Sequence, residues 1–244
     1  MTANSTGPRW PVSTPRLTIR PAEAEDLPRM FEYRRKPEVA QWMTARPTDV
    51  DAFVERLRQP EHLAATFAVE KAGALVGDLY LARQDAWAQQ EVEELARGTQ
   101  AEIGYVIAPE FAGRGYASEA VAGLIRVCFE DLGLRRVVAE CFADNTASWR
   151  VMEKAGMRRE GRFRQGSLHR SGRWLDDLRY ALLADEWRAS RAGGSAVAEP
   201  PLHTSPSSAA PATVTASSRS ASSEGFGGRC TGTPASSTIS APAA

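Results

Sequence analysis

The order of elements in this chain is decided by residues 101–121, which read AEIGYVIAPEFAGRGYASEAV. Apolar side chains at every second position from Ile103 to Ile107 predict a strand that Pro109 ends. Gly113 and Gly115 lack a Cβ atom, so their backbone amides can approach an anion closely. The helix predicted after them adds unpaired N–H groups and the positive end of its dipole. The stretch therefore predicts a loop that binds phosphate, and a pyrophosphate better than a single base.

Two other phosphate-binding loops fit this stretch poorly. A P-loop needs Lys followed by Ser or Thr after its second glycine, and Tyr116 and Ala117 stand there. A Rossmann loop is half matched, and Glu140 even follows at the distance of a ribose-binding acid. However, Rossmann glycines follow the strand directly, whereas five residues separate Ile107 from Gly113. Nucleotide hydrolysis and dinucleotide binding are therefore disfavoured.

The composition changes sharply near residue 190. From 191 to 244, 42 of 54 residues are Ala, Ser, Gly, Pro or Thr, a composition that cannot bury a core. We therefore expect an N-terminal extension over 1–14, one domain over 15–190 and a disordered tail over 191–244. A passive extension is favoured over a regulatory tail.

The charge and cysteine content favour a soluble, cytoplasmic protein. The 244 residues include 30 Lys+Arg and 30 Asp+Glu, so nothing indicates a nucleic-acid or membrane partner. No apolar run is long enough to span a membrane, and the first 15 residues lack the apolar core of a signal peptide. Neither the cysteines nor the histidines have the spacing of a metal site or disulfide, so no metal is expected. These residues are Cys128, Cys141, Cys230, His62, His169 and His203.

Periodicity and turn signals predict an α/β domain with a mixed sheet. Expected strands cover 16–20, 65–71, 74–83, 101–107, 136–142, 157–163 and 174–183. Expected helices cover 24–35, 38–43, 49–57, 116–133, 145–155 and a last turn from 185. Residues 84–98 are polar and acidic and are expected to form a surface loop.

The glycine loop resembles motif A of the GNAT superfamily of acetyl-CoA-dependent N-acetyltransferases, whose pattern is Q/R-x-x-G-x-G/A. The segment from Gly115 onward fits, whereas Ala112 stands where Gln or Arg is usual. Residues 113–120 are similar to the RimJ/RimL branch, which acetylates protein N-termini and small amines. Further matches in the right order are the opening strand at 14–21, the first-helix region at 36–39, the Asn-x-x-Ser motif at 145–148 and the closing segment at 172–187.

This resemblance covers residues 15–188 and implies the GNAT fold. That fold has a mixed, mostly antiparallel central sheet flanked by helices, and one strand pair splays open for acetyl-CoA. The implied contacts to acetyl-CoA are Val106, Ile107, Gly113, Arg114, Gly115, Tyr116, Ala117, Ser118 and Asn145.

The resemblance also implies the chemistry, in which an amine attacks the thioester directly. Because an ammonium is mostly protonated at pH 7, a base must take its proton, and Glu102 is the candidate. The alternative for Glu102 is a structural partner of an arginine. Backbone N–H groups near Val106 and Ile107 would hold the developing oxyanion.

Two residues of the Asn-x-x-Ser motif are candidates near the leaving thiolate. Ser148 is the candidate proton donor, and Asn145 is expected to cap its helix and contact the cofactor. The alternative is that both merely cap the helix. Trp42 and Tyr80 are candidates for the amine pocket, although core packing is the commoner role of such residues.

The sequence therefore predicts an acetyl-CoA-dependent N-acetyltransferase, with a protein N-terminal amino group as the first acceptor to consider. The alternatives are acetylation of a small amine, such as an aminoglycoside or polyamine, and a non-catalytic acyl-CoA sensor. The protein is expected to act as a monomer or homodimer.

Overall fold

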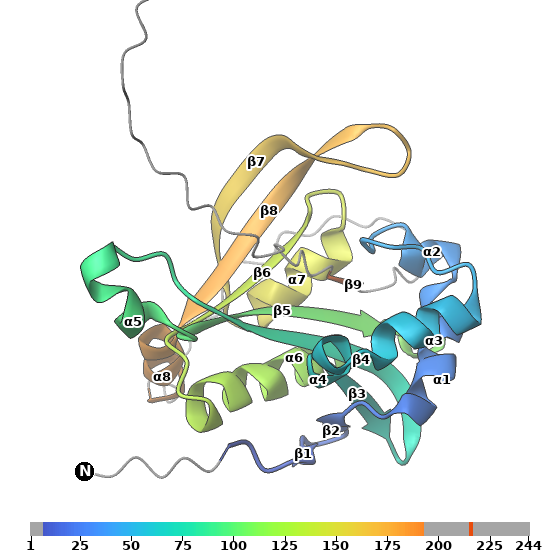
Figure 1. Ribbon diagram of the computed structural model, residues 1–244, viewed down its shortest axis with the longest axis horizontal. Coiled ribbons are helices and arrows are strands. Elements are labelled where there is room, and N and C mark those ends of the chain that lie inside the picture. The colour runs from blue at the N-terminus through green and yellow to red at the C-terminus, as the bar shows by residue number, and fades with distance from the viewer. Residues whose placement is uncertain (1–6, 193–214, 217–244) are drawn as a thin grey trace, which may run out of the picture.

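The computed structural model describes residues 7–192 and 215–216, and its centre is a single sheet (Figure 1). Its strands in the described residues are β1 (Val12–Ser13), β2 (Thr18–Pro21), β3 (Thr66–Lys71), β4 (Ala74–Gln84), β5 (Gln100–Ile107), β6 (Arg136–Phe142), β7 (Arg158–Leu168), β8 (Trp174–Leu183) and β9 (Thr215–Ala216). They run in the order β1-β2-β3-β4-β5-β6-β8-β7, and β9 pairs with β5 off this path. Only β5 and β6 are parallel among these pairings, so the predicted mixed, mostly antiparallel sheet is confirmed.

Helices cover both faces of the sheet, as Figure 1 shows. They are α1 (Leu27–Arg34), α2 (Pro37–Ala40), α3 (Val50–Arg58), α4 (Pro60–Ala64), α5 (Glu93–Ala96), α6 (Tyr116–Arg126), α7 (Thr146–Lys154) and α8 (Ala184–Ala192). One core packs α6, α7 and α8 against the sheet, and a second packs α1, α2 and α3 against the other face. Successive side chains of β5 alternate between them, so Tyr105 enters the first core and Val106 the second.

Local sequence signals place several element ends where they were expected. Ala72 and Gly73 both have positive φ, 48° and 79°, as a two-residue hairpin between β3 and β4 requires. Asp49 caps α3 by accepting from the Ala52 amide at 2.8 Å. Asn145 caps α7 in the same way, and Gly156, at φ 83°, follows its end. These signals act within four residues, so no tertiary information was needed to find them.

Other features were not foreseen. The hairpin strand β7 runs to Leu168, five residues past the expected end, because most of its side chains are exposed and leave no alternating pattern. The helix α8 continues to Ala192, two residues beyond the expected domain boundary. Within the expected N-terminal extension, Val12 is buried and pairs with Ile19.

The expected tail falls mostly outside the described residues. Residues 193–214 and 217–244 are not described, so the expectation of disorder is not tested there. Thr215–Ala216 are described, and they form β9 against β5.

The strands β5 and β6 diverge, and this divergence creates the central feature of the fold. Their parallel pairing covers only Gln100–Glu102 against Arg136–Val138. The antiparallel partner β4, by contrast, pairs with β5 along its whole length to Ile107. Beyond Glu102, the edge of β5 that faces β6 is therefore available to another partner.

A buried ion pair fixes α1 to β4 on the second face. Asp78 accepts from the Tyr33 hydroxyl at 2.6 Å and from Arg34 Nε at 3.0 Å. Burial raises the pKa of Tyr33, which keeps this phenol protonated as the donor. The pair thereby fixes the end of α1 against β4.

Candidate active site

The glycine loop forms the entry to α6. Gly113 and Gly115 have φ of 73° and 77°, and Gly115 is the N-cap of α6 in the left-handed conformation. A Cβ atom at Gly113 would meet no atom within 4 Å, so backbone conformation, rather than crowding, favours glycine there. The α6 helix then directs its unpaired amides toward the loop.

A hollow of about 590 Å³ lies on one side of the strand divergence, and a second hollow of about 260 Å³ lies at the glycine loop. The smaller one is lined by Ile107, Phe111, Ala112, Gly113, Gly115, Tyr116, Ala117, Ser118, Ala147, Arg150, Val151 and Lys154. Arg150 and Lys154 place two cations of α7 opposite the N-terminus of α6. This combination of amides, helix dipole and cations fits the phosphate groups of a coenzyme.

Most residues predicted at the loop line this hollow, but the side chain of Arg114 does not. Its guanidinium donates to the Glu110 carbonyl at 3.0 Å and lies over the Phe111 ring. The backbone carbonyl of Arg114 accepts from Arg16 at 3.0 Å. Arg114 is therefore a structural part of the loop through both its side chain and its backbone.

The loop is held from the connection between β1 and β2 by a contact that the sequence did not reveal. Arg16 forms an ion pair with Glu119 of α6 at 2.6 Å, and Thr14 donates to the same carboxylate at 2.6 Å. Burial opposes ionisation of Glu119, but these hydrogen bonds outweigh it and lower the pKa of the carboxyl. The Arg16 guanidinium also lies 4.9 Å from the centre of the Tyr116 ring.

Tyr105 and Ser148 meet at the divergence of β5 and β6. The Tyr105 hydroxyl donates to the Ser148 carbonyl at 2.8 Å and lies 3.0 Å from Ser148 Oγ. Burial raises the pKa of Tyr105, so the phenol stays protonated. Because its single hydrogen is given to the carbonyl, the Ser148 hydroxyl is left to donate to the Tyr105 oxygen.

Ser148 is fully buried, with 0 % exposure, in a polar cluster. Its amide donates to Asn145 Oδ1 at 3.2 Å, which is the expected cap. Its hydroxyl also hydrogen-bonds the Cys141 thiol. Burial raises the pKa of this thiol to about 12. Cys141 is therefore a protonated buried residue rather than a nucleophile.

Glu102 lies on the opposite face of β5 from Tyr105. It is 5 % exposed and accepts from Gln84 Nε2 at 2.9 Å. Tyr80 lies on the same face, since it pairs with Gly104 in the β4–β5 register. Among the described residues, neither Glu102 nor Tyr80 lines the two hollows.

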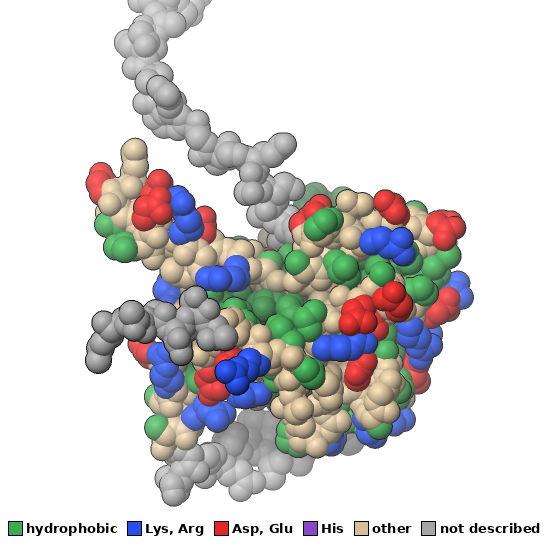
Figure 2. Space-filling view, turned by 60° about the horizontal axis from the view of Figure 1, so that its bottom comes forward, with side chains coloured by type: hydrophobic (Ala, Val, Ile, Leu, Met, Phe, Trp, Pro, Cys, Tyr) green, Lys and Arg blue, Asp and Glu red, His purple; other side chains and the backbone are tan. Residues whose placement is uncertain are grey.

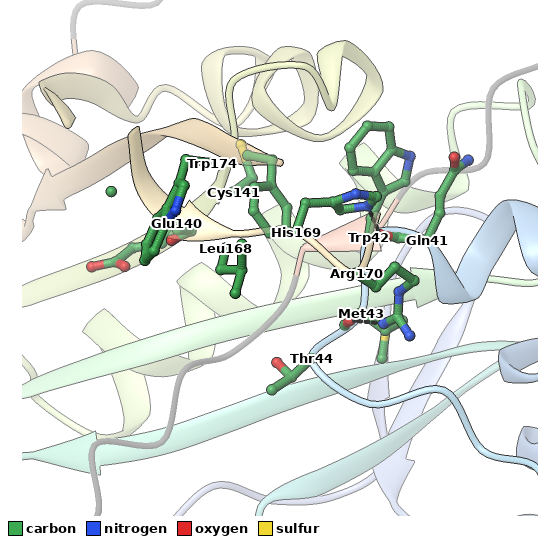
Figure 3. Close-up of a pocket in the computed structure, with 13 residues that line it drawn as sticks. Gln41, Trp42, Met43, Thr44, Glu140, Cys141, Leu168, His169, Arg170 and Trp174 are labelled. Carbon is green, nitrogen blue, oxygen red and sulfur yellow. Dashed lines mark hydrogen bonds between the residues drawn. The ribbon is translucent and has the colours of Figure 1, made fainter. Parts of the chain in front are cut away.

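The larger hollow, here called the aromatic pocket, is drawn in Figure 3. Its lining residues are Gln41, Trp42, Met43, Thr44, Glu140, Cys141, Phe142, Gly166, Ser167, Leu168, His169, Arg170 and Trp174. They come from the segment after α2, the end of β6 and the β7–β8 hairpin. Trp42 lines this pocket, whereas Tyr80 does not.

Two hydrogen bonds join the hairpin to the segment after α2. His169 Nε2 lies 2.9 Å from the Gln41 carbonyl, and the Ser171 amide donates to His169 Nδ1 at 3.2 Å. With Nδ1 accepting, Nε2 carries the hydrogen that is given to Gln41. Arg170 donates to the Met43 carbonyl at 2.5 Å. Sequence reasoning missed His169 because its partners lie about 130 positions earlier in the chain.

The part of the chain that the structure describes holds neither a candidate metal site nor a candidate membrane-spanning helix. No three His, Cys, Asp or Glu side chains there come together as metal ligands. None of its helices has the length and apolar character needed to cross a membrane. On the face in Figure 2, acidic and basic side chains are interspersed rather than separated by sign.

Comparisons with known proteins agree with this geometry. Residues 16–158 match the family described as acetyltransferase (GNAT) domain. The putative ribosomal N-acetyltransferase YdaF of Bacillus subtilis is 31 % identical over 185 residues, covering 72 % of this chain and 95 % of that protein. A crystal structure of a GNAT-family acetyltransferase from Bacillus anthracis is 31 % identical, with a TM-score of 0.60 and coverage of 71 % and 98 %.

Two more distant solved structures share the fold. RimL, a ribosomal L7/L12 alpha-N-protein acetyltransferase in complex with coenzyme A, is 22 % identical, with a TM-score of 0.59 and coverage of 72 % and 98 %. A chimera of the Vibrio cholerae spermidine N-acetyltransferase SpeG with hSSAT is 23 % identical, with a TM-score of 0.58 and coverage of 71 % and 98 %.

Proposed function

Since the chain belongs to the GNAT family of acetyltransferases, we propose that it transfers acetyl from acetyl-CoA to a protein N-terminal amino group. The observation that carries this proposal is the position of the Tyr105–Ser148 pair. Ser148 contacts Cys141, which lines the aromatic pocket, while its neighbour Ala147 lines the hollow at the glycine loop. An acceptor in one hollow and a cofactor in the other would meet at this pair.

The hollow at the glycine loop is the proposed cofactor end. Acetyl-CoA supplies the acetyl group as a thioester, which leaves the residues of this chain to bind, orient and move protons. The α6 amides, Arg150 and Lys154 would hold its phosphates. Because the Ala108 amide donates to the Val76 carbonyl, strand alternation directs the Val106 amide to β4 and the Ile107 amide to the open edge. Of the two amides, Ile107 is therefore better placed to stabilise an oxyanion.

Proton transfers are assigned to Glu102 of β5 and to Ser148 of α7, which lies on the opposite face of that strand. Glu102 is the proposed base that takes the proton of the ammonium, directly or through water. The Ser148 hydroxyl is the proposed donor to the departing thiolate, and for this its hydrogen would have to turn from the Tyr105 oxygen toward the sulfur. Glu102 lines neither hollow, so a water between it and the amine fits the geometry better than direct contact.

The aromatic pocket favours a peptide over a polyamine as the acceptor. Among its described lining residues, Glu140 is the one acid, and Arg179 Nε already donates to it at 2.6 Å. Arg170 adds a positive charge. A polyamine carries further ammonium groups, and these would find no carboxylate without a partner in the pocket.

We place this activity in the cytoplasm. Cys128 and Cys141 are buried and unpaired, which fits a reducing compartment.

A panel of acceptors tests the proposal. Purified protein is mixed with acetyl-CoA and with short peptides, spermidine or an aminoglycoside, and thiol release and product mass are measured. We expect acetylation of the peptide α-amino group. Acetylation of spermidine or the aminoglycoside alone would move the protein to the small-amine class, and acetyl-CoA binding without any product would identify a sensor.

A further inference from the structure

We infer that the aromatic pocket binds an apolar side chain of the acceptor, at the first or second residue beside the reacting amine. The inference rests on the proposed function and adds the class of peptide that is used. It is argued from three rings that line the pocket, from two exposed apolar residues beside them, from the charges of the lining and from the contact between the pocket and Ser148.

Three rings form one wall of the pocket. The ring centres of Trp42 and Phe142 lie 6.1 Å apart, those of Trp42 and His169 5.9 Å, and those of Phe142 and His169 5.5 Å. Each comes from a different segment of the chain, and Figure 3 shows Trp42 and His169 together at one end of the pocket. Rings held in this way offer a rigid apolar surface at little entropic cost on binding.

Two further lining residues leave unusually large apolar surfaces uncovered. Trp174 is 59 % exposed and Leu168 is 58 % exposed, and both belong to the hairpin. Apolar side chains that are exposed around a concave site mark a place where a ligand removes them from water. A peptide side chain of similar size in the 590 Å³ pocket would do so.

The charges of the pocket exclude a cationic side chain there. Glu140 is paired with Arg179, and Arg170 adds a positive charge to the lining. A lysine side chain would therefore lose hydration without gaining a free carboxylate. The rings are therefore inferred to bind an apolar side chain, and not an ammonium group through a cation–π contact.

The pocket is close to the reaction centre, so the bound side chain belongs near the N-terminus of the acceptor. Cys141 lines the pocket and hydrogen-bonds Ser148, the proposed thiolate donor. A side chain farther along the peptide would be separated from this point by several extended residues of about 3.3 Å each.

The test uses three peptides that differ only at their first two residues. These two residues are both Phe in the first peptide, both Ala in the second and both Lys in the third. We expect kcat/KM for the Phe peptide to exceed that for the Lys peptide by about tenfold or more. Trp174→Ala should reduce this ratio to below about threefold. Trp87→Ala is the matched control, because Trp87 is 90 % exposed on the loop after β4 and lines neither hollow.

The outcomes separate this inference from the proposed function. Equal kcat/KM values for the three peptides, or a ratio that Trp174→Ala leaves unchanged in a variant with the parent melting temperature, would overturn the inference alone. A Phe-to-Lys ratio of kcat/KM that falls equally in the control Trp87→Ala would also overturn it. Acetylation of small amines but of no peptide would overturn the proposed function as well.

A separate observation concerns the chain's own C-terminal segment. β9 pairs antiparallel with β5, Tyr105 opposite Ala216 and Val106 opposite Thr215. Because β4 occupies the other edge of β5, β9 lies on the edge that the divergence leaves open, as Figure 1 shows. Thr213-Val214-Thr215 is also the one run of three β-branched residues in the 54 tail residues of the sequence.

From this pairing we infer that β9 competes with acetyl-CoA. With its phosphates at the glycine loop and its thioester near Ser148, acetyl-CoA would run its amide-containing arm along this edge of β5. One strand edge can pair with only one partner at a time. The apparent dissociation constant of acetyl-CoA is therefore the intrinsic value divided by the fraction of molecules in which β9 is unpaired.

Proline substitutions in the full-length chain test the competition. Thr215→Pro removes a backbone N–H and disfavours the strand, so acetyl-CoA should bind about threefold tighter or more by calorimetry. Ala221→Pro changes the same tail outside β9 and should keep the parent affinity. Equal affinity of Thr215→Pro and the parent, or equal tightening by both substitutions, would overturn the competition. The readout is binding, so it does not depend on which acceptor is used.

Discussion

Removing the hydroxyl groups of Tyr105 and Ser148, singly and together, tests the contact at the divergence of β5 and β6. Tyr105→Phe deletes the donor to the Ser148 carbonyl and the partner of Ser148 Oγ. Ser148→Ala deletes only Oγ and leaves the bond from Tyr105 to the carbonyl in place. Both sites are buried, so water cannot replace the lost partner without rearrangement.

The geometry sets the size of the expected effects. A buried polar group left without its partner costs about 1–3 kcal/mol. Tyr105→Phe removes the partner of the Ser148 carbonyl at 2.8 Å and of the Ser148 hydroxyl at 3.0 Å, so it should destabilise the protein more than Ser148→Ala. The double variant should be less destabilised than the sum of the two by about 1 kcal/mol, because the shared bond is counted once in each single variant.

Chemical unfolding of the parent and three variants measures this coupling. Each loss of about 1 kcal/mol also corresponds to about 2–4 °C in the melting temperature of a domain of this size. Turnover at saturating acetyl-CoA should fall in both single variants, since Tyr105 orients the Ser148 hydroxyl. High pH should restore neither, because the lost group is a donor rather than a base.

Additive free energies of unfolding would refute the shared hydrogen bond. Parent-like turnover in Ser148→Ala, with the expected loss of stability, would instead limit Ser148 to a structural role. The two measurements therefore separate the structural contact from the proposed donor.

Three further predictions address the loop, the base and the pH dependence of stability. Gly115→Glu should abolish acetyl-CoA binding, because residue 115 has φ 77° and a carboxylate would stand at the first amides of α6. If calorimetry found an unchanged affinity in a folded variant, acetyl-CoA would not bind in the hollow at the glycine loop. Glu102→Gln should lower turnover about 10²–10⁴-fold at neutral pH and keep acetyl-CoA affinity, with partial recovery at high pH where more amine is neutral. A pH–rate profile like that of the parent would mean that another group takes the proton. Burial opposes ionisation of Glu119, but hydrogen bonds from Thr14 and Arg16 hold the pKa of its carboxyl below the usual 4.5. The unfolded chain therefore binds this proton first as the pH falls, so the stability from Glu119 is complete above about pH 5 and is lost below it. Glu119→Gln should flatten the fall in melting temperature between about pH 5 and pH 3, and an equally steep fall would exclude this contribution.

The fold and the loop were largely predictable from the sequence because their signals are local. The glycines at 113 and 115 have the positive φ that their residue type permits, and Asn145 caps α7 through a bond to an amide three residues away. Strand β6 was predicted with its observed bounds because its side chains alternate between buried and half-buried positions. The long hairpin strand β7 was predicted only in part, because it has almost no buried face.

The candidate site was predictable only in the part that lies on these local motifs. Ser148 and Trp42 were named from their motif and residue type, but the burial of Ser148 beneath Tyr105 was not foreseen. The exclusion of Tyr80 from the pocket likewise depends on strand register, which decides the face of each side chain.

What the sequence by itself determined is therefore the order of elements, the glycine loop at the start of α6 and the family, since each depends on residues within a few positions of one another. What only the tertiary structure decided is the aromatic pocket, the Tyr105–Ser148 contact and the pairing of β9 with β5. Tyr105 and Ser148 are 43 positions apart, and His169 meets Gln41 across 128 positions. Contacts of this range follow from how sheet register and helix packing bring distant segments together, and no local spacing in the sequence encodes them.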